Sequence, residues 1–334
     1  MVKSKSEDAD RGEQIFRVLP KQVGRTIAAA LRDWLPGQSW TQLHKLLAGR
    51  RIMVSGNLCT DAGRRLKLPD VVKLLTHPLA APPRESDVAV VYLDSQVIVV
   101  DKPAGVTSTR HSEERHWPAR RRQIQPTLDE MIPAIIAKRE GRRGKGKPPP
   151  VRAVHRLDRD TSGLMVFART PSAEKHLAQQ FRQHTTQRRY FAIAQGDVRE
   201  QTIESRLVRD RGDGRRGSTP LPDAGKKSKT HFKPLKKLGD YTLVECRPET
   251  GRTHQIRIHL AEAGHPLCGE KVYLQPLFRP ALKDASGAPR LALCAVELEF
   301  QHPVSGKRLR FAIPLAKDLA EFVKRIEKQS PPPP

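Results

Sequence analysis

The sequence is poor in cysteine, in aromatic side chains and in negative charge, and each shortage narrows what the protein can be. Its four cysteines lie far apart along the chain and form no C-x-x-C pair: Cys59, Cys246, Cys268 and Cys294. That spacing is typical of neither a zinc site nor a redox motif. We therefore expect a reduced, cytoplasmic protein that binds no metal, with each cysteine acting as a small buried apolar residue.

Long apolar runs are also missing. No stretch approaches the ~20 residues that a membrane-spanning helix needs, and the first twenty residues lack the apolar core of a signal peptide. The 334 residues, of which 37% are hydrophobic, suffice for a packed core in one to three domains. These features predict a soluble globular protein.

Acidic residues are outnumbered by basic ones. The chain has 61 Lys and Arg against 36 Asp and Glu, which gives a net charge of +25. Such a surplus opposes compaction by self-repulsion unless a polyanion binds. We expect nucleic acid as the partner; an anionic membrane surface is the alternative, and the lack of apolar runs argues against it.

Two short helical patterns follow a charged lead-in, residues 1–14. The first has apolar residues at helical spacing and stops at Pro36-Gly37, while the second opens with a Ser39/Gln42 capping box and ends at Gly49. Short extended pieces continue to about residue 75. The cations left for the solvent side of the second helix are Lys45, Arg50 and Arg51.

Residues 15–76 resemble the small RNA-binding module first known from a small-subunit ribosomal protein. The alternative is an ordinary helical hairpin whose cations only form a solvated face. Residues 77–86, rich in proline, read as a linker to a second domain over residues 87–328, and residues 329–334 as a proline-rich tail.

The second domain begins with two valine-rich strands, 87–93 and 96–101, that form a hairpin. Lys102-Pro103-Ala104-Gly105 then leaves the sheet, and Lys102 could meet a phosphate. The basic runs at 111–125 and 138–150 flank a helix-like segment. We expect this insertion, about residues 111–150, to add salt-sensitive affinity for nucleic acid.

The chain is organised around His155–Leu164, a polar loop that leads into a buried strand. Because such a strand fixes the geometry of the loop beside it, a reactive side chain is well placed here. Asp158 is the candidate. The alternative is that Asp158 closes a turn or pairs with Arg156 or Arg159.

Further along the chain, Thr170 predicts a helix cap with Pro171 at the first helical position. Residues 210–229, rich in glycine and arginine, predict a loop that could lie on a polyanion.

A second distinctive stretch, Thr250–Leu260, predicts a helix capped by Thr253. Helix starts attract anions, and Arg252 at the mouth with Arg257 one turn in would strengthen this. A carboxylate or a phosphate is the expected neighbour. His254 and His259 are five residues apart and so point in different directions, which argues against a shared metal.

Three segments together resemble the RluA-type pseudouridine synthases: Asp101–Gly105, Ala153–Ala168 and Thr250–Tyr273. The resemblance covers roughly residues 87–326. It implies an α+β catalytic domain on a long, mixed, mostly antiparallel sheet with flanking helices, often preceded by the small RNA-binding module. It also implies an isomerase that converts a chosen uridine in RNA to pseudouridine without metal or cofactor.

The resemblance also implies roles for individual residues. Asp158 matches the essential aspartate of the family, Arg257 the basic residue that pairs with it, and Tyr190 the tyrosine that stacks on the uracil. Arg156 resembles the arginine that enters the RNA helix as the target nucleotide turns out. Further expected RNA contacts are Arg252 and Gln255.

Two departures from the family pattern show: Gly269-Glu270 where Gly-Asp is usual, and Cys294 where a histidine is usual. Neither touches the proposed nucleophile, so they bear only on how closely the substrate contacts follow those of the family.

The chemistry fits these residue types. Isomerisation breaks the N-glycosidic bond, turns the uracil and rejoins it through ring carbon 5. A carboxylate can act as nucleophile or as general base on the sugar, and a nearby guanidinium keeps a carboxylate ionised. The base must be flipped out of its stack, at a cost of a few kcal/mol.

The sequence also bears on other functions and on the substrate. A non-catalytic RNA-binding assembly factor explains the charge but not Asp158 opposite an arginine-mouthed helix. A kinase is excluded, because Leu157 interrupts the H-R-D order and no D-F-G follows. For the enzyme we expect ribosomal RNA of the large subunit as substrate, with transfer RNA the alternative, and a monomer.

Overall fold

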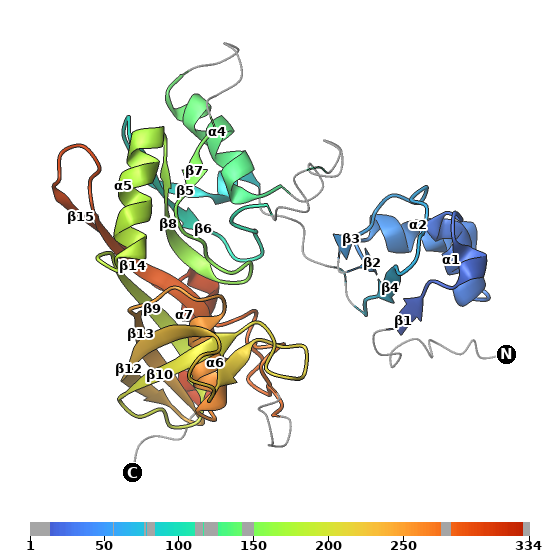
Figure 1. Cartoon of the computed structure of the whole chain (residues 1–334). Helices are drawn as coiled ribbons and strands as arrows, with labels where there is room; N and C mark the ends of the chain where they lie inside the picture. The colour runs from blue at the N-terminus through green and yellow to red at the C-terminus, as the bar shows by residue number, and fades with distance from the viewer. Residues whose placement is uncertain are drawn as a thin grey trace. The chain divides into compact units, whose positions relative to one another are not determined.

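The computed structural model describes residues 14–55, 57–76, 78, 84–110, 116, 126–141, 150–274 and 282–329. Most of the lead-in, linker, insertion and tail predicted from sequence lies outside these residues. The chain divides into two compact units, residues 1–81 and 82–334, coloured blue and cyan-to-red in Figure 1. Each unit is described by itself.

The first unit is a small antiparallel sheet with two helices. The sheet has the order β1-β4-β2-β3, and its elements are β1 Gln14–Arg17, α1 Ile27–Trp34, α2 Trp40–Ala48, β2 Ile52–Val54, β3 Asn57–Leu58 and β4 Val71–Leu74. The predicted capping box of α2 is confirmed, since Ser39 Oγ accepts from Gln42 N and Gln42 Oε1 accepts from Ser39 N. Thr26 caps α1, so Val23 lies outside the helix and is 47% exposed.

The second unit is built on an eleven-stranded sheet. Nine strands follow the order β11-β10-β12-β13-β9-β14-β8-β6-β5, with β15 paired to β14 and β7 to β8. Their bounds are β5 Ala89–Leu93, β6 Val97–Lys102, β7 Arg152–Ala153, β8 Ser162–Ala168, β9 Gln187–Gln195, β10 Gln201–Val208, β11 Gly217–Thr219, β12 Lys226–Leu238, β13 Tyr241–Pro248, β14 Leu293–Gln301 and β15 Arg308–Ala312. The α+β fold with a mixed, mostly antiparallel sheet is confirmed.

Helices cover both faces of this sheet, as Figure 1 lets the reader follow. Apolar residues of α4 (Leu128–Arg139) and α6 (Gln255–Glu262) share one core cluster with the sheet. Residues of α5 (Pro171–Arg182) and α7 (Lys317–Gln329) belong to clusters on the opposite face. Central strands are therefore apolar on both sides: in β6, Val97 and Val99 face α5, while Ile98 and Val100 face α4.

A parallel pair at the centre of the sheet fixes where β8 begins. Cys294 and Ala295 of β14 lie beside Ser162 and Gly163 of β8. Gly163 has φ +116°, and a Cβ there would lie 2.2 Å from the Ala295 oxygen. Only glycine allows this close approach of the two backbones. The loop that precedes β8 is thereby held against a rigid strand.

Two further predictions concern α5 and the segment before β12. Thr170 caps α5 with Pro171 at its first position, as predicted. The predicted loop over residues 210–229 is present at 210–216 and 220–225, but β11 and the start of β12 also lie in this range and pair with β10. None of the helices in the described ranges is long and apolar enough to span a bilayer.

Candidate active site

The loop before β8 is tied down on both sides of Asp158. The Ser108 hydroxyl donates to the Leu157 oxygen over 2.7 Å and accepts from the Leu157 N–H over 3.1 Å. Gly105 N donates to the Arg159 oxygen over 2.8 Å, and Arg159 Nε donates back to the Gly105 oxygen over 3.1 Å. The segment that leaves β6 thus sets the backbone position of Asp158.

Lys102 belongs to this clamp, and its predicted contact with a phosphate was wrong. The side chain is fully buried, and Nζ donates to the oxygens of Pro103, Val106 and Arg159 at 2.8 to 3.0 Å. Burial lowers the pKa of Lys102 to about 7. An ammonium enclosed by three carbonyl groups is not available to RNA, and its role is to hold the loop.

The Asp158 carboxylate meets two groups from the other stretch that the sequence singled out. Arg257 Nη1 lies 3.5 Å from Oδ2, and His254 Nε2 lies 3.8 Å from Oδ1. Neither Arg156 nor Arg159 is its partner among the described residues, although its backbone oxygen does accept from Thr161 N and closes a turn. The side chain is 16% exposed, so a substrate can reach it.

Arg257 is held more tightly by Glu270 than by Asp158. Nε and Nη2 of Arg257 bind Glu270 Oε2 and Oε1 at 2.8 and 2.7 Å, a bidentate pair in which both side chains are almost fully buried. Burial alone lowers the pKa of Arg257, but the hydrogen bonds and charge of Glu270 more than offset this and raise it. For Glu270, burial alone raises the pKa, but the hydrogen bonds and charge of Arg257 outweigh it, so the pKa is lowered.

The departure at position 270 therefore bears on the site, contrary to the sequence-based expectation. Glu270 is linked to Asp158 through a single residue, Arg257, which contacts both carboxylates. Cys294, the other departure, is buried beside Ser162 at the start of β8. Both side chains are buried, Glu270 against the cationic partner of Asp158 and Cys294 beside the start of β8.

His254 joins this cluster from the mouth of α6. It is the residue that precedes the helix, it has a left-handed backbone (φ +60°), and its side chain makes no capping bond. The prediction that Thr253 caps the helix was therefore wrong. His254 Nδ1 lies 2.6 Å from Tyr273 Oη, and the guanidinium of Arg257 lies 5.2 Å from the centre of the Tyr273 ring.

Gln255, an expected RNA contact, is instead part of the scaffold. Its side chain is buried: the oxygen accepts from Arg252 N and the Thr250 hydroxyl, while Nε2 donates to the Lys229 oxygen and Thr230 Oγ1. His259, one helical turn further along, is also buried, and its Nδ1 is hydrogen-bonded to Thr230 Oγ1. These bonds dock α6 on β12 and so fix Arg257; the prediction for Gln255 was wrong.

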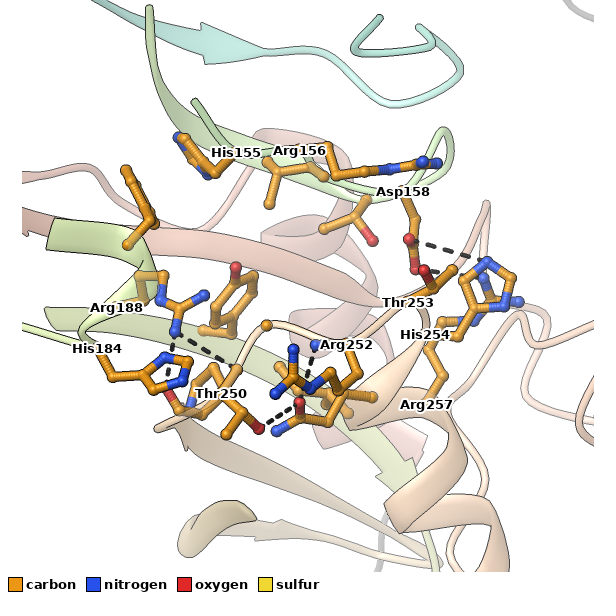
Figure 2. Close-up of a pocket in the computed structure, with 18 of the residues that line it drawn as sticks. His155, Arg156, Asp158, His184, Arg188, Thr250, Arg252, Thr253, His254 and Arg257 are labelled. Carbon is orange, nitrogen blue, oxygen red and sulfur yellow. Dashed lines mark hydrogen bonds and ion pairs between the residues drawn. The ribbon is translucent and has the colours of Figure 1, made fainter. Parts of the chain in front are cut away.

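A cavity of about 470 Å³ opens beside Asp158. Its walls come from the loop before β8, the end of α5, the start of β9 and the segment before α6, and Figure 2 shows Asp158 and His254 at one end and His184 and Arg188 at the other. Among the described residues that line it, five arginines stand against the one carboxylate of Asp158: Arg156, Arg182, Arg188, Arg252 and Arg257. The cavity suits a polyanion with a reacting centre near the acid.

The predicted site residues that line this cavity differ in how exposed and how tightly hydrogen-bonded their side chains are. Arg156 is exposed, whereas Arg252 Nε donates to the Lys227 oxygen over 3.0 Å. Tyr190, on β9, lines the cavity floor and is 9% exposed, and burial raises its pKa. Lys45, Arg50 and Arg51 belong to the first unit, where Arg51 Nε donates to the Leu75 oxygen.

Sequence reasoning missed His254, Glu270 and Tyr273 as neighbours of Asp158. All three lie inside or beside the Thr250–Tyr273 motif, so the motif itself carried a signal. Arg188 was missed as well: its Nη2 donates to the oxygens of Pro248, Glu249 and Thr250, and its buried Nε has no hydrogen-bond partner in the described parts of the chain. No cluster of His, Cys, Asp or Glu in the described ranges could hold a metal ion.

One carboxylate among five arginines of the described lining is an arrangement that suits chemistry on a polyanion. A family model described as RNA pseudouridylate synthase matches residues 96–262. The chain therefore belongs to the RluA-type RNA pseudouridine synthases, which are isomerases.

Relatives and solved structures agree with this. Ribosomal large subunit pseudouridine synthase D of Zymomonas mobilis is 31% identical over 92% of this chain and 95% of its own length. Ribosomal large subunit pseudouridine synthase C of Vibrio cholerae is 31% identical over 94% and 97%. The structure of human RNA pseudouridylate synthase domain containing 4 matches the fold with a TM-score of 0.56, at 20% identity over 71% of this chain and 92% of that one.

Proposed function

We propose that this enzyme isomerises a specific uridine of large-subunit ribosomal RNA and that Asp158 is its catalytic carboxylate. The observation that carries the proposal is the cavity in which Asp158 is the one acid among five arginines of the described lining. The names of the relatives from Zymomonas mobilis and Vibrio cholerae support the choice of ribosomal RNA. The alternative of a non-catalytic RNA-binding factor falls away with membership of the family.

In this proposal Asp158 acts on the ribose of an everted uridine, as nucleophile on C1′ or as base. Its 16% exposure leaves room for contact with the sugar. Arg257 Nη1 lies 3.5 Å from the carboxylate, and because Glu270 holds Arg257 independently, the guanidinium stays in place while Asp158 reacts. Tyr190 gives the detached uracil a flat surface on which to turn.

The basic end of the cavity takes the RNA backbone. Arg182 and His184 are exposed there, and Arg252 is half-buried, so phosphates can reach all three. Arg156, which is exposed and lines the same cavity, would fill the space left in the RNA helix by the flipped nucleotide. Contacts of this kind offset the cost of unstacking the base.

The first unit is proposed to bind RNA as well, through Lys45 on α2 with Arg50 and Arg51 behind it. Lys45 is exposed. The protein is expected to act as a cytoplasmic monomer without cofactor.

Mapping pseudouridine in total RNA from a strain that lacks the gene tests the proposal. We expect one or a few large-subunit ribosomal positions to lose the modification and to regain it with the wild-type gene but not with Asp158→Asn. Loss confined to transfer RNA would replace the proposed substrate, and restoration by Asp158→Asn would remove Asp158 from the mechanism.

A further inference from the structure

The catalytic cavity holds a histidine, His254, to which the reaction described above gives no role. Its Nε2 lies 3.8 Å from Asp158 Oδ1, and both residues line the same end of the cavity (Figure 2). A group that acts on C1′ lies about 3 Å from it. Because the new bond joins C5 to that same carbon, the hydrogen on C5 comes to lie in the neighbourhood of both side chains.

The reaction needs a proton acceptor at this point. Once C5 has bonded to C1′, it carries both the sugar and its original hydrogen, and N1 is an imine nitrogen double-bonded to C6. To restore the ring, the C5–H bond must break: its electron pair forms C5=C6, the former C6=N1 pair moves to N1, and N1 takes a proton from water. The proton from C5 must go to a base.

We propose that His254 is the base that removes this proton, with Nε2 as the accepting atom. The proposal rests on the function assigned above. The tautomer it requires has its own proton on Nδ1, donated to Tyr273 Oη over 2.6 Å, so that the Nε2 lone pair faces the cavity. After each turnover the imidazolium returns the proton to water.

The other proton acceptors that line the cavity are less suitable. His155 Nε2 already accepts the Val166 N–H over 3.0 Å, so in the neutral ring its other nitrogen carries the proton. His184 lies at the opposite end of the cavity. Tyr190 would first have to ionise, and burial raises its pKa. In general an imidazole is also a stronger base than a carboxylate.

The surroundings of His254 keep it neutral, as a base must be. Burial lowers its pKa, the Asp158 charge acts in the opposite direction, and Arg257 lowers it again. Glu270 and Arg216 add smaller opposing effects, so the net direction is downward. The ring is fixed by Tyr273, whose own ring meets it edge-on with centroids 5.5 Å apart.

His254→Asn is the test variant that the backbone favours. Asparagine tolerates the left-handed conformation at this position. Its amide also occupies the place of Nδ1, so the contact with Tyr273 can persist while Nε2 is removed. A matched thermal transition of variant and wild type verifies that the fold is kept.

The substrates are transcripts of the RNA identified by mapping, made with uridine, with uridine deuterated at C5, or with 5-fluorouridine. Fluorine at C5 is not removed, so the rearranged 5-fluoro product forms without this base. We expect His254→Asn to slow pseudouridine formation about 10²-fold, to show a primary isotope effect at C5, and to rearrange 5-fluorouridine at the wild-type rate.

Two outcomes would overturn the proposal: an unchanged rate on uridine, or equal slowing on uridine and 5-fluorouridine, which would mean that His254 only positions its neighbours. Asp158→Asn serves as the reference because it should block both substrates. If Asp158→Asn still rearranged 5-fluorouridine, the role of Asp158 would fail independently of the result for His254.

Discussion

The two parts of the cavity differ in whether their charged side chains are paired. At the end that holds Asp158, opposite charges are paired, because Arg257 lies between Asp158 and Glu270 and interacts with both acids. Away from Asp158, the described cavity wall contributes Arg182, Arg188 and Arg252 but no further carboxylate. Paired charges hold a reactive geometry, whereas uncompensated ones attract phosphates. We therefore expect variants near Asp158 to change the reaction rate and variants of the other arginines to change RNA affinity.

Asp158→Asn should have the largest effect, and it should act on catalysis alone. We expect catalysis to fall by about 10⁴-fold, the upper range for a group that acts in acid–base steps, while RNA affinity changes little because no cation is removed. Release of tritium from C5-labelled uridine measures the rate. Asp160→Asn, an exposed neighbour in the same loop, is the control and should keep its activity; similar losses in both variants would contradict the assignment.

Arg257→Ala should damage stability as well as rate. It leaves Glu270 buried without a partner, which typically costs about 3 to 5 kcal/mol, and it removes the cation next to Asp158. Chemical denaturation measures the first effect and tritium release the second.

The double variant Arg257→Met/Glu270→Leu distinguishes the two roles. Replacing both members of a buried pair by apolar groups is often neutral for stability, so we expect the unfolding free energy to recover while activity stays low. If activity recovered together with stability, the ion pair would be structural only.

Arg182→Ala probes the binding end and should have a smaller effect. The turnover of bound RNA should stay unchanged, while the slope of log affinity against log salt becomes shallower by about 0.7 for each phosphate that the variant no longer neutralises. Lys324→Ala, an exposed cation on α7 on the opposite face of the sheet from α6, is the control. A changed turnover for Arg182→Ala would blur the division between the two ends.

Lys45→Ala in the first unit should have the smallest effect. A single exposed ion pair is worth about 1 kcal/mol or less, so we expect at most an approximately fivefold weaker RNA affinity and the same maximal rate. Filter binding at several salt concentrations measures it. An affinity equal to that of wild type would favour the alternative that this surface is only a solvated face.

The elements of the fold were largely predictable because they depend on local patterns. Apolar spacing marked α1 and α2, the Ser39 capping box and the Thr170 cap marked two helix starts, and the apolar run after Gly163 marked β8. Within residues 210–229 the sequence did not reveal β11 and the start of β12, because glycines and cations favour a loop there and these strands pair with β10.

By itself the sequence determined the class of fold, the stretch that carries Asp158 and the helix that brings Arg257 to it, since period, capping and motif are properties of neighbouring residues. Only the tertiary structure decided that Lys102 and Gln255 are buried supports, that Glu270 holds Arg257, and that His254 faces Asp158. The reason is physical: whether a polar side chain meets substrate or scaffold depends on which distant backbone folds over it, and no local pattern encodes that.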